Sequence, residues 1–180
     1  VNGTAVYTSA FTPPTAPVTA ITNTALLCNF TNAGIYDAAV NSDMVTVGNA
    51  QVSTGQAKYG TTSLYLDGTG DWLTTRGGDL FQFGTGDFTI ECWVNKPSAA
   101  NGPIIDARGA ALATPYAFYV DGSNYPYFYE GTVFTSSVAI TNNQWNHIAV
   151  TRASGTLRIF VNGVQGYSGS VTTNLTAAST

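Results

Sequence analysis

The acidic side chains and the single histidine are the residues of this sequence whose chemistry could be catalytic. Hydrolysis of a glycosidic bond with retention needs two carboxylates about 5 Å apart, one as nucleophile and the other as acid/base. The chain has two glutamates, Glu91 and Glu130, which stand far apart in the sequence. His147 lies on an alternating segment beside Trp145, where a packed, hydrogen-bonded histidine is commoner than a catalytic base. These residues predict a protein that is not an enzyme.

A concentration of aromatic residues suits the binding of sugars. Seven aromatic residues fall between Tyr116 and Tyr129, around the turn formed by residues 121–124. Aromatic rings stack on the C–H faces of sugars, while carboxylates and carboxamides bind hydroxyl groups. The alternative is a hairpin whose rings pack in the core and against the neighbouring strand, which strand alternation favours. The candidate glycan-binding residues are Tyr116, Asp121, Asn124, Tyr125 and Tyr127.

The composition excludes several classes of partner. Only six residues are basic and the net charge is −4, so no basic cluster is present to neutralise nucleic acid phosphates. No run of 18 apolar residues indicates a membrane span, and no signal peptide is visible. The chain begins at Val1, which indicates processing or a segment of a longer protein. Charged residues make up 9% of the chain, so its surface must consist of Thr, Ser, Asn and Gly, as in extracellular and virion proteins.

The two cysteines, Cys28 and Cys92, lie in apolar runs. Two buried, free thiols are favoured, because unpaired cysteines are among the most buried residues. A disulfide between them would suit an oxidising compartment. The sequence leaves the choice between free and bonded cysteines open.

Alternation of apolar and polar residues predicts an all-β protein. The segment Gln144–Gly163 predicts three antiparallel strands, because Ser154-Gly155 and Asn162-Gly163 are turn pairs between alternating runs. A short helical turn is expected at Asp79–Phe83, and no segment has the period of a longer helix. The predicted strands are Ala25–Phe30, Met44–Val52, Ser63–Leu66, Trp72–Thr75, Phe88–Asn95, Ile104–Arg108, Tyr116–Val120, Tyr125–Glu130, Thr132–Ile140, Trp145–Thr151, Leu157–Val161 and Val164–Ser170.

Residues 1–24 differ from the rest of the chain. Three prolines among Ala, Thr and Val favour extended backbone and prevent a helix. We expect an arm or linker there, with Thr4–Phe11 as a possible strand, followed by one domain over residues 25–180. Within that domain, Phe88–Asn95 and Leu157–Val161 carry large residues on both faces, which predicts central strands covered on both sides.

Four segments in order resemble a known family. Lys58–Leu73 contains Leu-Asp-Gly before Gly-Asp-Trp-Leu, Gly84–Val94 contains Phe-Thr-Ile-Glu-Cys-Trp-Val, and residues 115–131 and Gln144–Gly163 form two hairpins. Together they are similar to the laminin-G-like, concanavalin A-like jelly rolls, of the kind found in marine phage and bacterial surface proteins. The resemblance spans roughly residues 25–176 and implies an antiparallel sandwich of two sheets. Most members of this superfamily are binding modules, and some are enzymes.

The resemblance also implies site residues. Relatives often hold Ca²⁺ with loop carboxylates and carbonyls, and Ca²⁺ takes six to eight oxygen ligands. Asp67 and Asp71 flank a Gly-rich turn, where turn-forming aspartates are the commoner alternative. The loop aspartates that could contribute are Asp37, Asp43, Asp67, Asp71 and Asp121.

Two features of the family are missing from this sequence. The pentraxin-like relatives join the strand of Cys92 to the strand Trp145–Thr151 by a disulfide, and the residue facing Cys92 is expected to be Ala149. The closing C-terminal strand is also absent before Thr180. Either the sequence is truncated, or the N-terminal arm or a neighbouring chain supplies that strand. Partners are therefore expected to be other modules or copies of the chain, bound through the arm and the open sheet edge.

Taken together, the residues and the resemblance favour a non-catalytic structural or adhesion module of a larger protein. That protein would be a virion component, such as a tail fibre or capsid decoration, or an extracellular surface or filament protein. The alternative is a lectin module that binds surface glycans. A third hypothesis, a glucanase, lacks the Glu-x-Asp-x-x-Glu motif of such enzymes. The expected location is extracellular, on a cell surface or in a virion.

Overall fold

The computed structural model describes residues 1–30, 34–39, 43–75, 78–108 and 115–176. The described residues form twelve β-strands and one short 3₁₀ helix, η1 (Gly78–Phe81), close to the helical turn that the sequence predicts. The chain divides into two compact units. Unit 1 consists of Val1–Pro13 and Gly78–Thr180, and unit 2 consists of Pro14–Gly77.

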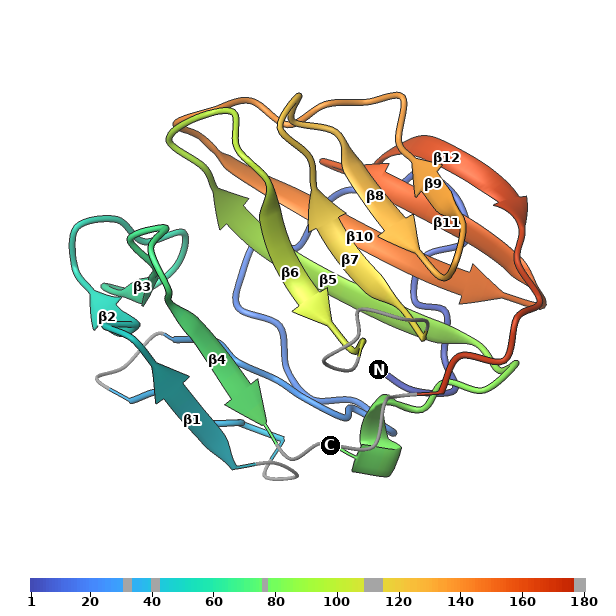
Figure 1. The fold of residues 1–180 in the computed structure, drawn as a ribbon, viewed down its shortest axis with the longest axis horizontal. Helices are drawn as coiled ribbons and strands as arrows, with labels where there is room; N and C mark the ends of the chain where they lie inside the picture. The colour runs from blue at the N-terminus through green and yellow to red at the C-terminus, as the bar shows by residue number, and fades with distance from the viewer. Residues whose placement is uncertain (31–33, 40–42, 76–77, 109–114, 177–180) are drawn as a thin grey trace. The chain divides into compact units, whose positions relative to one another are not determined.

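Unit 1 is a sandwich of two antiparallel, four-stranded sheets (Figure 1). The first, called here the β10 sheet, has the order β12-β11-β10-β5, and the second, the β7 sheet, has the order β6-β7-β8-β9. The fold class predicted from the sequence is confirmed. The strands of the β10 sheet are β5 (Phe88–Asn95), β10 (Trp145–Ala153), β11 (Thr156–Val161) and β12 (Val164–Ser170), and those of the β7 sheet are β6 (Gly102–Asp106), β7 (Ala117–Val120), β8 (Pro126–Tyr129) and β9 (Val133–Thr135).

The core lies between these two sheets. Successive side chains of a strand point to opposite faces, so every second residue of each central strand enters the core. On β7, Phe118 and Val120 point inward, and on β10 Ile148 and Val150 do the same. The core also contains Phe83, Phe88, Tyr116, Phe128, Ile140, Leu157, Ile159, Val161, Val171 and Leu175.

The three consecutive strands that the segment Gln144–Gly163 predicts are present as β10, β11 and β12, and β12 begins directly after Gly163. Ser154 and Gly155 both have positive φ, as do Asn162 and Gly163. Residues in this left-handed region form the tight turns whose twist matches that of the flanking strands. The turn signals therefore determined this part of the topology correctly.

Strand β5 occupies the end of its sheet, so the prediction that it is central was wrong. Asn2 forms an antiparallel bridge to Phe88 beside the start of β5. The residue paired with Cys92 is Ile148, whereas Ala149 pairs with Glu91, so the expected partner was one position off. Cys28 and Cys92 are both free, and burial raises the pKa of the Cys92 thiol to about 12.

The described residues of unit 2 form two antiparallel, two-stranded sheets. Strand β1 (Met44–Val47) pairs with β4 (Trp72–Thr75), and β2 (Gln51–Ser53) pairs with β3 (Ser63–Tyr65). The predicted strand Met44–Val52 is broken after Val47, because Gly48 has a φ of +72°. The predicted strand Ala25–Phe30 is not formed.

Candidate functional site

The outer face of the β7 sheet, which points away from the core, carries three tyrosines. Tyr119 on β7 pairs across the sheet with Tyr127 on β8, and Ala117 pairs with Tyr129. Because Phe118 fills the core, alternation places these tyrosines on the opposite face. The rings of Tyr119 and Tyr127 stack with centroids 5.4 Å apart and planes 16° from parallel. The pair presents aromatic surface outside the core.

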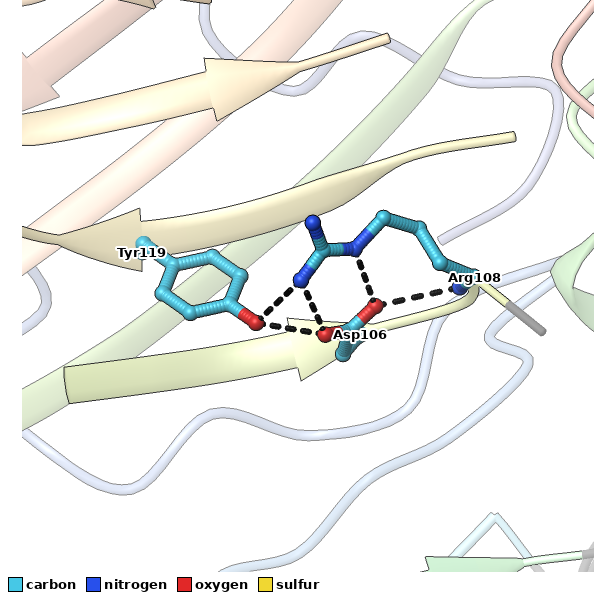
Figure 2. Close-up of polar contacts among 3 residues, drawn as sticks. All are labelled: Asp106, Arg108 and Tyr119. Carbon is cyan, nitrogen blue, oxygen red and sulfur yellow. Dashed lines mark hydrogen bonds and ion pairs between the residues drawn. The ribbon is translucent and has the colours of Figure 1, made fainter. Parts of the chain in front are cut away.

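An arginine and an aspartate adjoin Tyr119 (Figure 2). Arg108 donates from Nε to Oδ1 of Asp106 at 2.8 Å and from Nη2 to Oδ2 at 2.6 Å, which is the bidentate geometry of a strong ion pair. Nη2 also donates to the hydroxyl of Tyr119, which in turn donates to Oδ2 of Asp106. The carbon Cζ of Arg108 lies 5.4 Å from the ring centroid of Tyr119 and 5.5 Å from that of Tyr129. We call Asp106, Arg108, Tyr119, Tyr127 and Tyr129 the tyrosine face.

Hydrogen bonds within this cluster keep Asp106 and Arg108 charged. Burial alone would raise the pKa of Asp106, but the hydrogen bonds from Arg108 and Tyr119 outweigh it and keep the pKa below its usual value. The hydrogen bonds to Asp106 raise the pKa of Arg108. Burial, together with the bond to Asp106, raises the pKa of Tyr119 to about 12. At neutral pH the cluster is therefore an ion pair beside a neutral phenol, with no net charge.

The structure separates the five residues predicted to bind glycans. Tyr116 is 0% exposed, and its hydroxyl donates to the carbonyl of Phe81 at 2.8 Å, so it belongs to the core. Tyr127 lies on the tyrosine face.

The other three predicted residues form the turn between β7 and β8. Oδ1 of Asp121 accepts the backbone N–H groups of Ser123 and Tyr125, each at 2.8 Å, and Asn124 has a φ of 71°. The N–H of Asp121 donates to the carbonyl of Tyr125, which extends the β7–β8 pairing by one step toward the turn. Asp121 thus stabilises the turn that joins β7 to β8, at one end of the tyrosine face.

Of the five aspartates that could bind calcium, all but Asp121 lie in unit 2, and Asp37, Asp67 and Asp71 form hydrogen bonds within loops. Oδ1 of Asp71 accepts the N–H of Asn49 and its Oδ2 accepts that of Asp67, both at 2.9 Å. Oδ1 of Asp37 accepts the N–H groups of Leu27 and Ala39, and Asp43 is exposed. Among the residues that the structure describes, no three His, Cys, Asp or Glu side chains gather as metal ligands would. The structure thus brings Asp67 and Asp71 together around a turn.

A second polar cluster lies on the outer face of the β10 sheet. Oε2 of Glu91 accepts the hydroxyl of Tyr7 at 2.7 Å and lies 2.9 Å from Nε2 of His147. Burial would raise the pKa of Glu91, but the hydrogen bonds from His147 and Tyr7 keep it below its usual value. Glu130 follows β8 in the other sheet, so the two glutamates belong to different sheets. They do not form the carboxylate pair of a glycosidase.

The comparisons with known proteins agree with this architecture. The model of the concanavalin A-like lectin/glucanases superfamily, in its laminin G form, matches residues 67–180, which is more than half of the chain. The chain belongs to this superfamily. No curated protein sequence matches it.

Three solved structures of bacterial proteins are similar to this chain. Domain 4 of AbnA, a GH43 extracellular arabinanase from Geobacillus stearothermophilus solved with arabinotriose, is 15% identical with a TM-score of 0.53, and the match covers 79% of this chain and 73% of that one. An S-layer domain-containing protein from Clostridium thermocellum is 21% identical with a TM-score of 0.51, covering 82% and 73%. A Bacteroides ovatus protein is 14% identical with a TM-score of 0.40, and although the match covers 73% of this superfamily member, it spans only 33% of the Bacteroides protein.

Among the described residues of this superfamily member, no helix is long and apolar enough to cross a membrane.

Proposed function

We propose that unit 1 is a non-catalytic carbohydrate-binding module and that the tyrosine face contacts the sugar. The observation that carries the proposal is the stacked pair of Tyr119 and Tyr127 beside the ion pair of Asp106 and Arg108. The rings offer flat apolar surface for the C–H face of a pyranose or furanose ring. Asp106 and Arg108 offer acceptors and donors for its hydroxyl groups.

The charges of the site favour a neutral glycan. The carboxylate of Asp106 already neutralises Arg108 through two hydrogen bonds, so the pair has little net field with which to attract an acidic sugar. Its side chains retain partial exposure, 29% for Asp106 and 17% for Arg108. A ligand can therefore reach them without breaking the pair. The first probe is arabinotriose, because the fold-related arabinanase domain was solved with that sugar.

Titration calorimetry with arabinotriose, following a glycan array, tests the proposal. Replacing Tyr119 or Tyr127 with Ala removes a stacking surface, so the affinity for the bound glycan should fall at least about tenfold, equivalent to ~1.4 kcal/mol. Tyr65→Ala is the matched control, because Tyr65 is an exposed tyrosine of unit 2. Unchanged affinity in both variants of the tyrosine face, or no glycan bound by the natural chain, would contradict the proposal.

The wider role that we propose is adhesion, within a larger extracellular, cell-surface or virion protein. The low content of charged residues supports this setting, because surfaces built of Thr, Ser and Asn are typical of such proteins. The rival class is a glucanase acting through Glu91. Hydrolysis of a β-glucan by the natural chain, lost in Glu91→Gln, would establish that rival and reject a non-catalytic module.

A further inference from the structure

Residues Val1–Pro13 lie against the β10 sheet, although in the sequence all of unit 2 separates them from its strands. These residues, which we call the arm, belong to unit 1, although residues 14–77 separate them from the rest of it. The N–H of Gly3 donates to the carbonyl of Asp87 at 2.7 Å, and the N–H of Thr89 donates to the carbonyl of Val1 at 3.0 Å. The start of the arm therefore forms a single antiparallel bridge beside β5, at the end of the β10 sheet.

The arm then crosses the outer face of that sheet, one strand after another. On β5, the hydroxyl of Thr89 accepts the N–H of Val6 at 2.8 Å and donates to the carbonyl of Thr4 at 3.0 Å. On β10, the hydroxyl of Thr151 donates to the carbonyl of Tyr7 at 2.7 Å. Side chains of the sheet thus form hydrogen bonds with backbone groups of the arm.

Two aromatic side chains anchor the arm. The rings of Tyr7 and Phe11 stack with centroids 3.6 Å apart and planes 5° from parallel. The edge contacts of Phe11 are to His147 at 5.6 Å and to Phe160 at 5.2 Å between centroids. The hydroxyl of Tyr7 donates to Glu91. Side chains of β5, β10 and β11 (Glu91, His147 and Phe160) therefore contact two aromatic residues four positions apart, and we call this contact surface the groove.

The backbone of the arm passes close to Gly163. The N–H of Phe11 donates to the carbonyl of Gly163 at 3.0 Å. A Cβ atom at position 163 would lie 1.7 Å from the carbonyl oxygen of Phe11, which is an impossible contact with backbone. Any side chain at position 163 must therefore displace this part of the arm.

We propose that the groove also binds the arm of a second copy of the chain, so that copies assemble by exchanging arms. The contacts of the arm are the same whether it comes from the same chain or from another, so effective concentration decides between the two. The boundary between the units falls between Pro13 and Pro14, with Pro17 close behind. Proline-rich backbone is extended and semi-rigid, so it gives the arm a lower effective concentration at its own groove than a flexible connection would. This proposal does not rest on carbohydrate binding.

Two complementary full-length variants test the exchange. Gly163→Ala blocks the groove and leaves the arm intact, whereas the double variant Tyr7→Ala/Phe11→Ala removes the anchors and leaves the groove open. Sedimentation velocity should show monomers for each variant alone and a heterodimer in an equimolar mixture. A mixture that stays monomeric, while both variants keep the circular dichroism of the natural chain, would overturn the proposal.

The natural chain provides an independent measurement if a variant fails to fold. Its dimer fraction should rise with concentration and be substantial at ~1 mM, because a semi-rigid connection gives the arm an effective concentration no higher than that of a short flexible tether. The variant Pro13→Gly/Pro14→Gly leaves the groove untouched and loosens the connection, so its dimer fraction should fall severalfold at equal concentration. A natural chain that is monomeric at ~1 mM, or a dimer fraction unchanged by the glycines, rejects arm exchange.

Discussion

Oε2 of Glu91 on β5 lies 2.9 Å from Nε2 of His147 on the neighbouring strand β10. His147 is 1% exposed and Glu91 is 19% exposed, so the pair is largely shielded from water by the arm and the sheet. The hydroxyl of Tyr7 donates to the same carboxylate oxygen at 2.7 Å. A single acidic side chain therefore links the arm to two strands of the sheet, which explains why a carboxylate is tolerated at this depth.

Acid should weaken the folded state through Glu91. Its pKa in the folded chain is lowered by the hydrogen bonds from His147 and Tyr7, which outweigh the opposing effect of burial. The stabilisation is therefore complete well above the unfolded value of about 4.3 and is lost as the pH falls through the lower, folded pKa. Urea unfolding from pH 7 to pH 2.5 should show a steeper acid loss for the natural chain than for Glu91→Gln. Equal slopes for the two proteins would remove Glu91 from the explanation.

The buried side chain of Arg152 should contribute strongly to the stability of the sandwich, because it holds the loop before β5 and the segment after β12. Its Nε, Nη1 and Nη2 donate to the carbonyls of Gly86, Thr173 and Gly84, and its guanidinium lies over the ring of Phe88. Arg152→Met keeps much of the volume but leaves three carbonyls without these donors, so the free energy of unfolding should fall by ~2–4 kcal/mol.

Arg152→Lys is the control for that change. A lysine keeps the charge but lacks the planar fork, so it should recover only part of the loss in urea unfolding. Amide exchange at Leu175, whose N–H donates to the carbonyl of Gly84, should accelerate in both variants. A destabilisation below ~0.5 kcal/mol in Arg152→Met would show that water replaces the guanidinium without cost.

Much of the sandwich could be predicted because its signals are local. Alternation and turn residues located Phe88–Asn95 and Val164–Ser170 of the sandwich, and also Trp72–Thr75 of unit 2, with the bounds that the structure has. The predicted strand Ala25–Phe30 failed for a non-local reason. The N–H of Leu27 donates to the carboxylate of Asp37, so a side chain takes the place of a partner strand.

Only part of the candidate site could be predicted from the sequence. Tyr116 shares its parity with Phe118, so alternation alone would have placed it in the core. Asp106 and Arg108 carried no such signal, because their position depends on how β6 pairs with β7. That pairing has an irregularity between Pro103 and Ile105, and it sets Asp106 opposite Ala117, one residue along β7 from Phe118 and two from Tyr119. A shift of pairing by one residue would turn Asp106 away.

Asp106→Asn should separate stability from binding on the tyrosine face. The ion pair with Arg108 is partly exposed, so its loss should change the free energy of unfolding by less than ~1 kcal/mol. The bidentate bonds fix the guanidinium beside Tyr119, so the affinity for the bound glycan should fall about tenfold, or ~1.4 kcal/mol. Calorimetry and thermal unfolding of the same samples measure both. If affinity is retained while stability falls, the pair is structural only.

Alanine substitutions at two glycines of unit 2 should distinguish the energetic cost of backbone strain from that of a steric clash. Gly48 and Gly68 both have positive φ, at +72° and +89°. A Cβ at Gly48 would lie 2.3 Å from Oδ1 of Asp71 and 2.5 Å from the carbonyl oxygen of Gly70, whereas nothing lies within 4 Å of a Cβ at Gly68. Gly68→Ala should therefore cost only the left-handed conformation, ~1–2 kcal/mol, and Gly48→Ala should cost more. Urea unfolding of the two variants decides the matter, because equal costs would mean that the turn around Asp71 moves aside freely.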